Sequence, residues 1–169
     1  MEYWDVLDEN GNPTGEIMKK YDEKVFERGL YHLGSDLWPI NSENKILIQK
    51  RSSQKRLEPN VWAMTGGSVI VGENSKQTII RESKEELDIN VNGDDLKLIT
   101  RFKTGNVWID TYIIKKDYDI SEMKFKEDEV SEVKWASFEE IDDLVNKGQF
   151  IKHRWEFVSK FLKNEIENK

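Results

Sequence analysis

Three glutamates fall close together in a segment that the sequence predicts to be helical. They are Glu82, Glu85 and Glu86. Asn74 is a suitable helix N-cap, and Gln77 lies at the capping-box position. The apolar residues Ile80 and Leu87 lie seven apart, as they would on one helical stripe. On such a helix the three carboxylates share a face, where they repel one another unless a cation lies between them. The segment therefore predicts a helix from about residue 74 to 88 with a site for Mg²⁺, and the alternative is a solvated charged face.

The rest of the chain consists mainly of strand-like runs separated by short turns. We expect strands at residues 3–7, 31–40, 45–50, 96–103, 107–115 and 130–136, and two C-terminal helices within about 137–167. The turn pair Asn10-Gly11 predicts an N-terminal β-hairpin over about residues 1–20. Strands interleaved with helices indicate an α+β fold with a mixed sheet, and 169 residues fit one domain, 1–169.

Charge and cysteine content exclude several functional classes. With 33 acidic and 26 basic residues the net charge is -7, which disfavours general nucleic-acid binding. No stretch approaches the ~18 uncharged apolar residues of a membrane span, and the first residues lack the pattern of a signal peptide. The absence of cysteine excludes disulfides, a thiolate nucleophile and cysteine-ligated metals. We therefore expect a cytoplasmic protein.

A glycine-rich stretch, Thr65-Gly66-Gly67, comes before the helix. We expect it to be a loop, because glycine lets the backbone approach a ligand closely and present its carbonyl oxygens. Arg81 can pair with Glu73 and so fix this loop against the helix.

The spacing of these residues resembles the Nudix box, G-x5-E-x7-R-E-U-x-E-E-x-G-U, in which U is a bulky aliphatic residue. The match runs from residue 67 to 89 and keeps six of the seven fixed positions. These are Gly67, Glu73, Arg81, Glu82, Glu85 and Glu86. Ser83 replaces an aliphatic residue and Asp88 replaces the last glycine. Neither departure removes a carboxylate. Ser83 should loosen the packing of the underside of the helix, and Asp88 should change the turn after it.

Resemblance to the Nudix hydrolases implies an α/β/α sandwich. It also implies Mg²⁺-dependent or Mn²⁺-dependent cleavage of a phosphoanhydride in a nucleoside diphosphate, free or linked to another moiety, by a metal-activated water. By the same resemblance Glu82, Glu85 and Glu86 are catalytic residues and metal ligands, with Glu82 the first candidate to orient the water. The carbonyl of Gly66 is a further ligand. Gly67, Glu73 and Arg81 would support the box.

Many members of this family supply another carboxylate from a downstream loop. The candidates here are Glu127, Asp128 and Glu129. We expect Glu129, which directly precedes the predicted strand at 130–136, to be that metal ligand. The alternative for each of the three is a solvated acidic loop.

The N-terminal hairpin and the segment Ile48–Ser52 are similar to those of a bacterial Nudix subgroup close in sequence to type I isopentenyl-diphosphate isomerases. Those isomerases need a catalytic cysteine just before the box, where this chain has Met64 and Thr65. Isomerase activity is therefore the less favoured alternative. Another alternative is a catalytically silent nucleotide-binding module, but such modules usually lose box carboxylates and none is lost here.

Substrate contacts are expected outside the box. Lys50 and Arg51 belong to a basic cluster at residues 50–56 that either contacts phosphate or is ordinary loop charge. Trp62 and Trp108 could stack on a base, although burial in the core is the favoured alternative for both. The expected partner is a small-molecule nucleotide, and a homodimer is an open alternative to a monomer.

Overall fold

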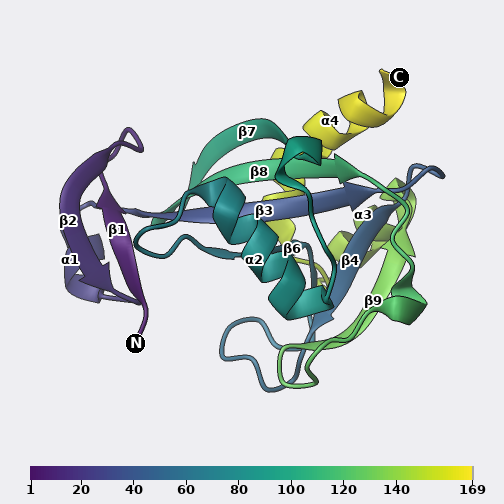
Figure 1. Cartoon of the computed structure of the whole chain (residues 1–169), viewed down its shortest axis with the longest axis horizontal. Helices are drawn as coiled ribbons and strands as arrows, with labels where there is room; N and C mark the ends of the chain where they lie inside the picture. Colours follow the sequence, from purple (N-terminus) through teal and green to yellow (C-terminus); the bar gives the residue numbers. More distant parts are fainter. Residues whose placement is uncertain (169) are drawn as a thin grey trace.

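The computed structural model describes residues 1–168, in which helices cover both faces of a mixed sheet beside a smaller N-terminal unit (Figure 1). The strands are β1 (Tyr3–Leu7), β2 (Pro13–Lys19), β3 (His32–Ile40), β4 (Ile46–Arg51), β5 (Trp62–Ala63), β6 (Thr65–Ser68), β7 (Lys97–Thr104), β8 (Val107–Lys115) and β9 (Val130–Ala136). The helices are α1 (Glu23–Glu27), α2 (Ser75–Leu87), α3 (Phe138–Asn146) and α4 (Lys152–Glu167), with short 3₁₀ turns at Gly93–Asp95 and Ile120–Glu122.

The main sheet is built around β3. Its strands follow the order β5-β4-β3-β8-β7, while β6 pairs with β3 and β9 pairs with β4. β3 and β8 are parallel over their whole length, and the other pairs are antiparallel. This mixed sheet confirms the expected α+β class, and the predicted strands and C-terminal helices all form within one or two residues of their expected limits.

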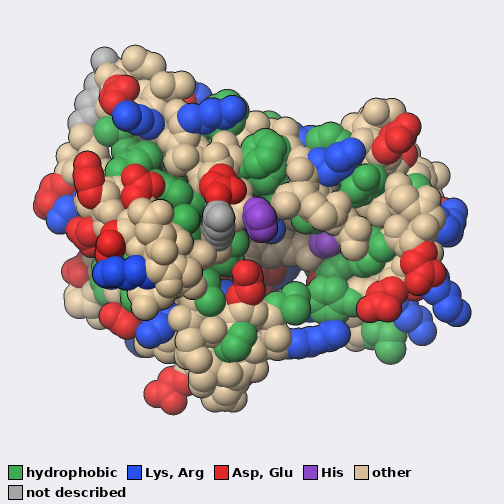
Figure 2. All heavy atoms as spheres, turned by 180° about the vertical axis from the view of Figure 1, so that it is seen from behind, with side chains coloured by type: hydrophobic (Ala, Val, Ile, Leu, Met, Phe, Trp, Pro, Cys, Tyr) green, Lys and Arg blue, Asp and Glu red, His purple; other side chains and the backbone are tan. Residues whose placement is uncertain are grey.

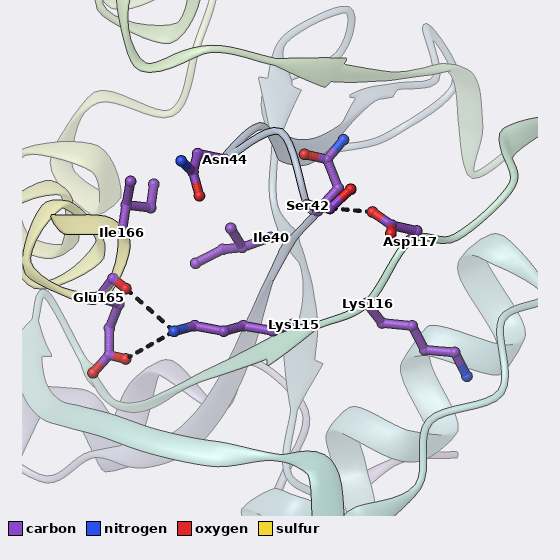
Figure 3. A pocket seen from close by; sticks show the side chains of 9 residues that line it. Ile40, Ser42, Asn44, Lys115, Lys116, Asp117, Glu165 and Ile166 are labelled. Atoms are coloured by element: carbon purple, nitrogen blue, oxygen red, sulfur yellow. Dashed lines mark hydrogen bonds and ion pairs between the residues drawn. The ribbon is translucent and has the colours of Figure 1, made fainter. Parts of the chain in front are cut away.

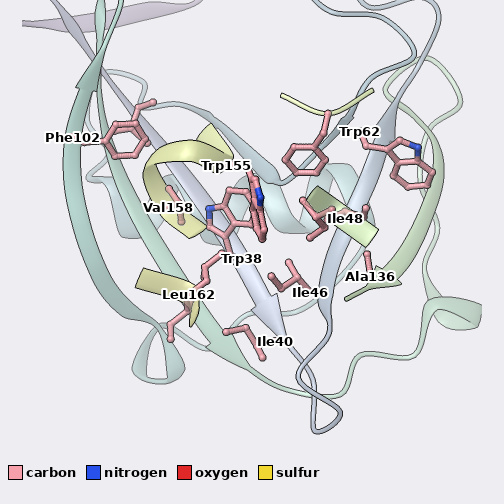
Figure 4. Packing of buried hydrophobic residues seen from close by; sticks show 14 residues of the cluster. Trp38, Ile40, Ile46, Ile48, Trp62, Phe102, Ala136, Trp155, Val158 and Leu162 are labelled. Atoms are coloured by element: carbon pink, nitrogen blue, oxygen red, sulfur yellow. The ribbon is translucent and has the colours of Figure 1, made fainter. Parts of the chain in front are cut away.

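Alternating residues of the central strands form two apolar cores on opposite faces of the sheet. Leu37 and Leu47 face α2, where they pack with Ile79 and Leu87. Trp38, by contrast, faces α3 and α4 and belongs to a larger cluster with Trp155 and other side chains of those helices (Figure 4). Because side chains alternate along a strand, one apolar run serves both cores, and the sandwich follows.

One expectation for the box is wrong. The stretch 65–67, which we predicted to be a loop, belongs to strand β6 (Thr65–Ser68), with Gly66 opposite Asp36 of β3. The approach is so close that a Cβ atom on Gly66 would lie 2.5 Å from the carbonyl oxygen of Ser35. Glycine is therefore required here for strand pairing, which brings the backbone of β6 beneath α2.

The N-terminal unit has its own small core. Trp4, Val6 and Met18 of the β1–β2 hairpin are buried against residues of α1 and the loop before α2. The Trp4 ring stacks on His32, the first residue of β3, with ring centroids 4.0 Å apart. The Leu7 amide also donates to the Tyr31 carbonyl oxygen at 2.7 Å. The unit is thus joined to the start of β3 by packing and hydrogen bonds.

The outer surface agrees with the charge pattern of the sequence. On the face opposite to that of Figure 1, acidic and basic side chains are interspersed (Figure 2). No helix within residues 1–168 is both long and apolar enough to cross a membrane.

Candidate functional site

Helix α2 positions the three glutamates of the box. Its N-terminus forms the expected capping box, in which the Asn74 side chain accepts from the Gln77 amide at 2.8 Å and the Gln77 side chain accepts from the Asn74 amide at 2.9 Å. Its buried stripe, which includes Ile79, Ser83 and Leu87, lies on the sheet. Glu82 and Glu86 flank that stripe one turn apart, so packing of the helix turns them toward β6.

The backbone of β6 lies directly beside one of these carboxylates. A Cβ atom on Gly67 would come within 2.5 Å of Glu82 Oε1. Because Gly67 has no side chain, the carboxylate can lie directly against the strand. Gly66 and Gly67 line the same cleft as the three glutamates, so oxygen atoms of side chains and backbone are gathered in one place.

Arg81 organises the rim of the site. Its Nε and Nη2 donate to the two oxygens of Glu73 at 2.8 and 3.1 Å, which confirms the pairing expected from the sequence. Its Nη1 also donates to Glu82 at 3.0 Å and to Glu85 at 3.2 Å. The hydrogen bonds from Arg81 lower the pKa of Glu73, and a further one comes from Thr78 at 2.7 Å. Glu73 is therefore held as an anion that fixes the loop before α2.

Glu82 and Glu86 lie in a far less polar environment. Burial raises the pKa of the Glu86 carboxyl well above its usual value, and the nearby negative charge of Glu82 raises it further. Burial also raises the pKa of Glu82, while Arg81 lowers it. Two neighbouring half-buried carboxylates of this kind hold protons to higher pH than isolated ones, and a cation between them would replace those protons. The pair therefore has the electrostatic character of a cation site.

The donor set fits Mg²⁺ or Mn²⁺. Such ions are usually bound by one or two carboxylates together with water and substrate phosphates. Glu82 and Glu86 supply two carboxylates, whereas the Glu85 side chain is 57% exposed and turned toward Arg81. Within residues 1–168 no three acidic or imidazole groups enclose a metal by themselves. The site thus leaves part of a coordination shell for backbone oxygens, water and phosphate.

The cleft that contains these groups extends between the main sheet and the N-terminal unit. It has a volume of about 430 Å³, and a contiguous outer compartment adds about 440 Å³. Arg51 and Lys55 line both parts. Glu129 lines both as well, and its carboxylate accepts from Lys55 Nζ at 2.5 Å. The preferred downstream carboxylate is therefore in the same cleft as the box, but it is paired with a lysine.

Three of the proposed substrate contacts lie elsewhere. Lys50 pairs with Trp62 across β4 and β5, and neither lines the cleft. Trp62 is buried in the α4-side core with Lys134 over its ring. Trp108 is half-buried, and its Nε1 donates to the Asp8 carbonyl oxygen at 3.3 Å. The buried alternative describes Trp62 well, whereas Trp108 braces the N-terminal hairpin.

Gln49 is a site residue that the sequence did not reveal. It lies on β4, and its Nε2 donates to Glu86 and, at 3.2 Å, to the hydroxyl of Thr65. Its neighbours Ile46 and Ile48 belong to one core and Leu47 to the other. A glutamine at an inward position of such a strand was the available signal, because a buried amide needs polar partners. Tyr21 and Lys20 of the N-terminal unit were also missed, and they line the cleft from its far side.

A separate hollow of about 210 Å³ lies at the other end of β3 (Figure 3). Lys115 Nζ donates to the Glu165 carbonyl oxygen at 3.2 Å, and Asp117 accepts from the Ser42 amide at 2.7 Å. These polar groups satisfy one another across the β3–β4 turn and α4. Their pairing indicates a structural role.

Comparisons with known proteins agree with this geometry. A model of the NUDIX domain matches residues 30–161. An uncharacterized Nudix hydrolase of Listeria monocytogenes is 34% identical over 154 residues, which cover 89% of each chain. An isopentenyl-diphosphate Delta-isomerase of Citrobacter koseri is 28% identical over 142 residues, covering 80% of this chain and 77% of the other.

Solved structures show the same fold. A crystal structure from Deinococcus radiodurans matches 88% of this chain and 91% of its own with a TM-score of 0.72 and 22% identity. A bifunctional NMN adenylyltransferase/ADP ribose pyrophosphatase of Francisella tularensis, complexed with AMP and a Mn ion, matches 79% of this chain and 42% of its own, with a TM-score of 0.61 and 21% identity.

Proposed function

The chain belongs to the Nudix family and is a Nudix hydrolase, and from that premise we propose that it cleaves a phosphoanhydride bond of a nucleoside diphosphate, free or linked to another moiety, with Mg²⁺ or Mn²⁺. The observation that carries the proposal is the half-buried pair Glu82 and Glu86 in the cleft that the glycines of β6 also line. A bound divalent cation would neutralise phosphate charge there and lower the pKa of a water molecule.

Each group in the cleft has a proposed part in this reaction. Glu82 and Glu86 would hold the metal, and Glu85 would join them by turning away from Arg81. The Gly66 carbonyl is a further proposed ligand. Glu82, whose carboxylate lies against Gly67 of β6, would accept a hydrogen bond from the attacking water and so orient it.

The cations of the cleft are proposed to receive the phosphates. Arg51 donates from Nε and Nη2 to the Leu57 carbonyl oxygen at 3.1 and 2.9 Å, which fixes its guanidinium group at the cleft. Lys55 neutralises Glu129 in the structure. A substrate phosphate would compete for Lys55 and so release Glu129, the proposed downstream ligand, toward the metal.

Two observations weigh against the alternatives. A silent binding module would not need the three box carboxylates, and all three line the cleft. The isomerase reaction needs a thiol before the box. Thr65 occupies that region, buried and hydrogen-bonded to Gln49, and the chain has no cysteine.

The test is a substrate panel of nucleoside di- and triphosphates, nucleotide sugars, ADP-ribose, NADH and coenzyme A. Phosphate release is measured with and without added pyrophosphatase and alkaline phosphatase, with Mg²⁺, with Mn²⁺ and with chelator. We expect turnover that the chelator abolishes. Metal-independent turnover, or conversion of isopentenyl diphosphate to its dimethylallyl isomer, would contradict the proposal.

A further inference from the structure

The outer compartment of the cleft has a composition unlike that of the inner part. The two parts form one continuous space, because they share Lys20, Tyr21, Arg51, Lys55 and Glu129, but none of the three box glutamates lines the outer compartment. The loop after β4 and the loop before β9 lie side by side there and are joined by a hydrogen bond from the Ser52 amide to the Glu129 carbonyl oxygen at 3.1 Å (Figure 1). A substrate with its diphosphate at the glutamates would extend its remaining part into this compartment.

Tyr21 presents an aromatic ring to that space. The residue is 45% exposed, and its φ of +62° is rare for a large side chain. The conformation is held by backbone hydrogen bonds on both sides, from Lys20 to Glu2 at 3.0 Å and from Asp22 to Lys19 at 3.1 Å. The buried Trp4 supports the ring edge-on, with centroids 5.2 Å apart and planes at 84°. The ring is therefore preorganised, and strained residues of this kind are concentrated at functional sites.

A planar cation already lies over that ring. The guanidinium carbon of Arg56 is 5.4 Å from the Tyr21 ring centroid, and Lys20 Nζ is 5.3 Å from it. Lys20 is paired with Glu2 at 3.4 Å, whereas Arg56 makes no ion pair within residues 1–168. Leu57, which is 53% exposed, adds apolar surface to the same compartment. An aromatic ring with a free arginine and nearby apolar surface is the chemistry that stacks nucleobases. A flat charged group on a flexible side chain can be displaced by a base and can then close over it.

We propose that Tyr21 is the stacking platform for the base of a nucleotide, with Arg56 closing over that base. The N-terminal unit then supplies part of the substrate site in the same chain and selects nucleotides over diphosphates that lack a base. The inference rests on the proposed function for the position of the diphosphate. Stacking itself can be measured without turnover.

The experiment measures binding by isothermal titration calorimetry. The probes are AMP, GMP, CMP and UMP, with ribose 5-phosphate as the base-free control, and the full-length chain is used throughout. We expect the best nucleotide to bind on the order of 10-fold tighter than ribose 5-phosphate, the effect of one stacked base. Equal affinities for nucleotides and ribose 5-phosphate would overturn the proposal.

Variants then locate the platform. Tyr21→Phe should keep the preference for a base, Tyr21→Leu should remove most of it because the π surface is lost, and Arg56→Ala should reduce it. Tyr3→Ala is the matched control, since Tyr3 is a similarly exposed tyrosine (42%) on β1 of the same N-terminal unit and lies outside the cleft. Melting temperatures and circular dichroism establish that each variant is folded. A folded Tyr21→Leu variant with the wild-type preference would refute the role of Tyr21.

The two proposals fail in different ways. Metal-dependent turnover with equal rates on nucleotides and on base-free diphosphates would contradict stacking and leave hydrolysis standing. Loss of the base preference in Tyr21→Leu, in a protein without turnover on any substrate, would support stacking and contradict hydrolysis.

Discussion

Gln49 of β4 donates a hydrogen bond to the carboxylate of Glu86 on α2, 37 residues further along the chain. The same amide reaches the Thr65 hydroxyl at 3.2 Å, so it joins three elements at the centre of the cleft. Gln49 is only 4% exposed, and such an amide orients the carboxylate that it contacts. Gln49 is therefore a positioning residue for the proposed metal ligand.

Replacing Gln49 should weaken metal binding without removing a ligand. For Gln49→Leu, a substitution of similar size, we expect a loss of about 10–100-fold in the affinity for Mg²⁺ or in kcat, because Glu86 loses its orienting donor. Titration of activity against metal concentration measures the effect. Gln77→Leu, on the exposed start of α2, tests for general helix destabilisation. Unchanged metal dependence in a folded Gln49→Leu protein would show that the contact is only structural.

Glu86→Gln should abolish the reaction and leave the fold intact. The substitution removes a carboxylate ligand, so kcat should fall by at least about 100-fold. It also removes a half-buried negative charge beside Glu82, so the melting temperature without metal should not decrease. Glu140→Gln, at an exposed glutamate of α3 outside the cleft, is the control. Full activity of Glu86→Gln would contradict the metal role.

Stability should depend on pH and metal together. Burial raises the folded-state pKa values of Glu82 and Glu86 above their unfolded values, so the folded state binds more protons. Their stabilising contribution is complete below about pH 4.5 and is lost as the pH rises through the folded pKa values. A divalent cation replaces those protons. Mg²⁺ should therefore raise the melting temperature more at about pH 8 than at about pH 5. An equal increase at the two pH values would show that Mg²⁺ does not replace protons on Glu82 and Glu86.

Gly66→Ala should destabilise the protein by about 1–3 kcal/mol, the usual cost of overpacking a well-packed region. The added methyl group would lie 2.5 Å from the Ser35 carbonyl oxygen, and both partners are backbone within paired strands. Urea unfolding measures the change. Gly93→Ala, at a glycine without a positive φ whose Cβ would make only an ordinary contact of 3.4 Å with Ile80 Cδ1, separates this collision from a general effect of replacing glycine. Wild-type stability of Gly66→Ala would show that β6 can move away from β3.

His32 should make the protein less stable in mild acid. Burial lowers its pKa from 6.5 to about 4, so between these values the unfolded chain binds a proton that the folded chain does not. Stability should therefore fall as the pH drops through this range, by about 2 kcal/mol at pH 5. His32→Phe keeps a ring beside Trp4 and should flatten that part of the pH profile. An unchanged profile, measured by denaturant unfolding from pH 7 to pH 5, would contradict this contribution.

Local features of the sequence determined helix α2 and its N-terminal cap. Asn74 and Gln77 cap α2 as expected, because capping depends on residues three apart in the chain. The pairing of Arg81 with Glu73 also followed, since both lie within one loop and the helix that it enters. Asp88, where the box has glycine, adopts the left-handed conformation at the end of α2, with φ 55° and ψ 34°. The box geometry therefore survives this departure.

Contacts between distant segments were decided only by the tertiary structure. Thr65–Ser68 is a strand because β3 lies beside it, and no local signal in two consecutive glycines predicts that partner. Likewise, Tyr21 lines the side of the cleft that faces the box glutamates. Its position depends on how the N-terminal unit packs on the start of β3. Spacing along a helix fixes which carboxylates are neighbours. Which strand lies beneath them, and which distant side chains surround a substrate, depends on long-range packing that one sequence does not encode locally.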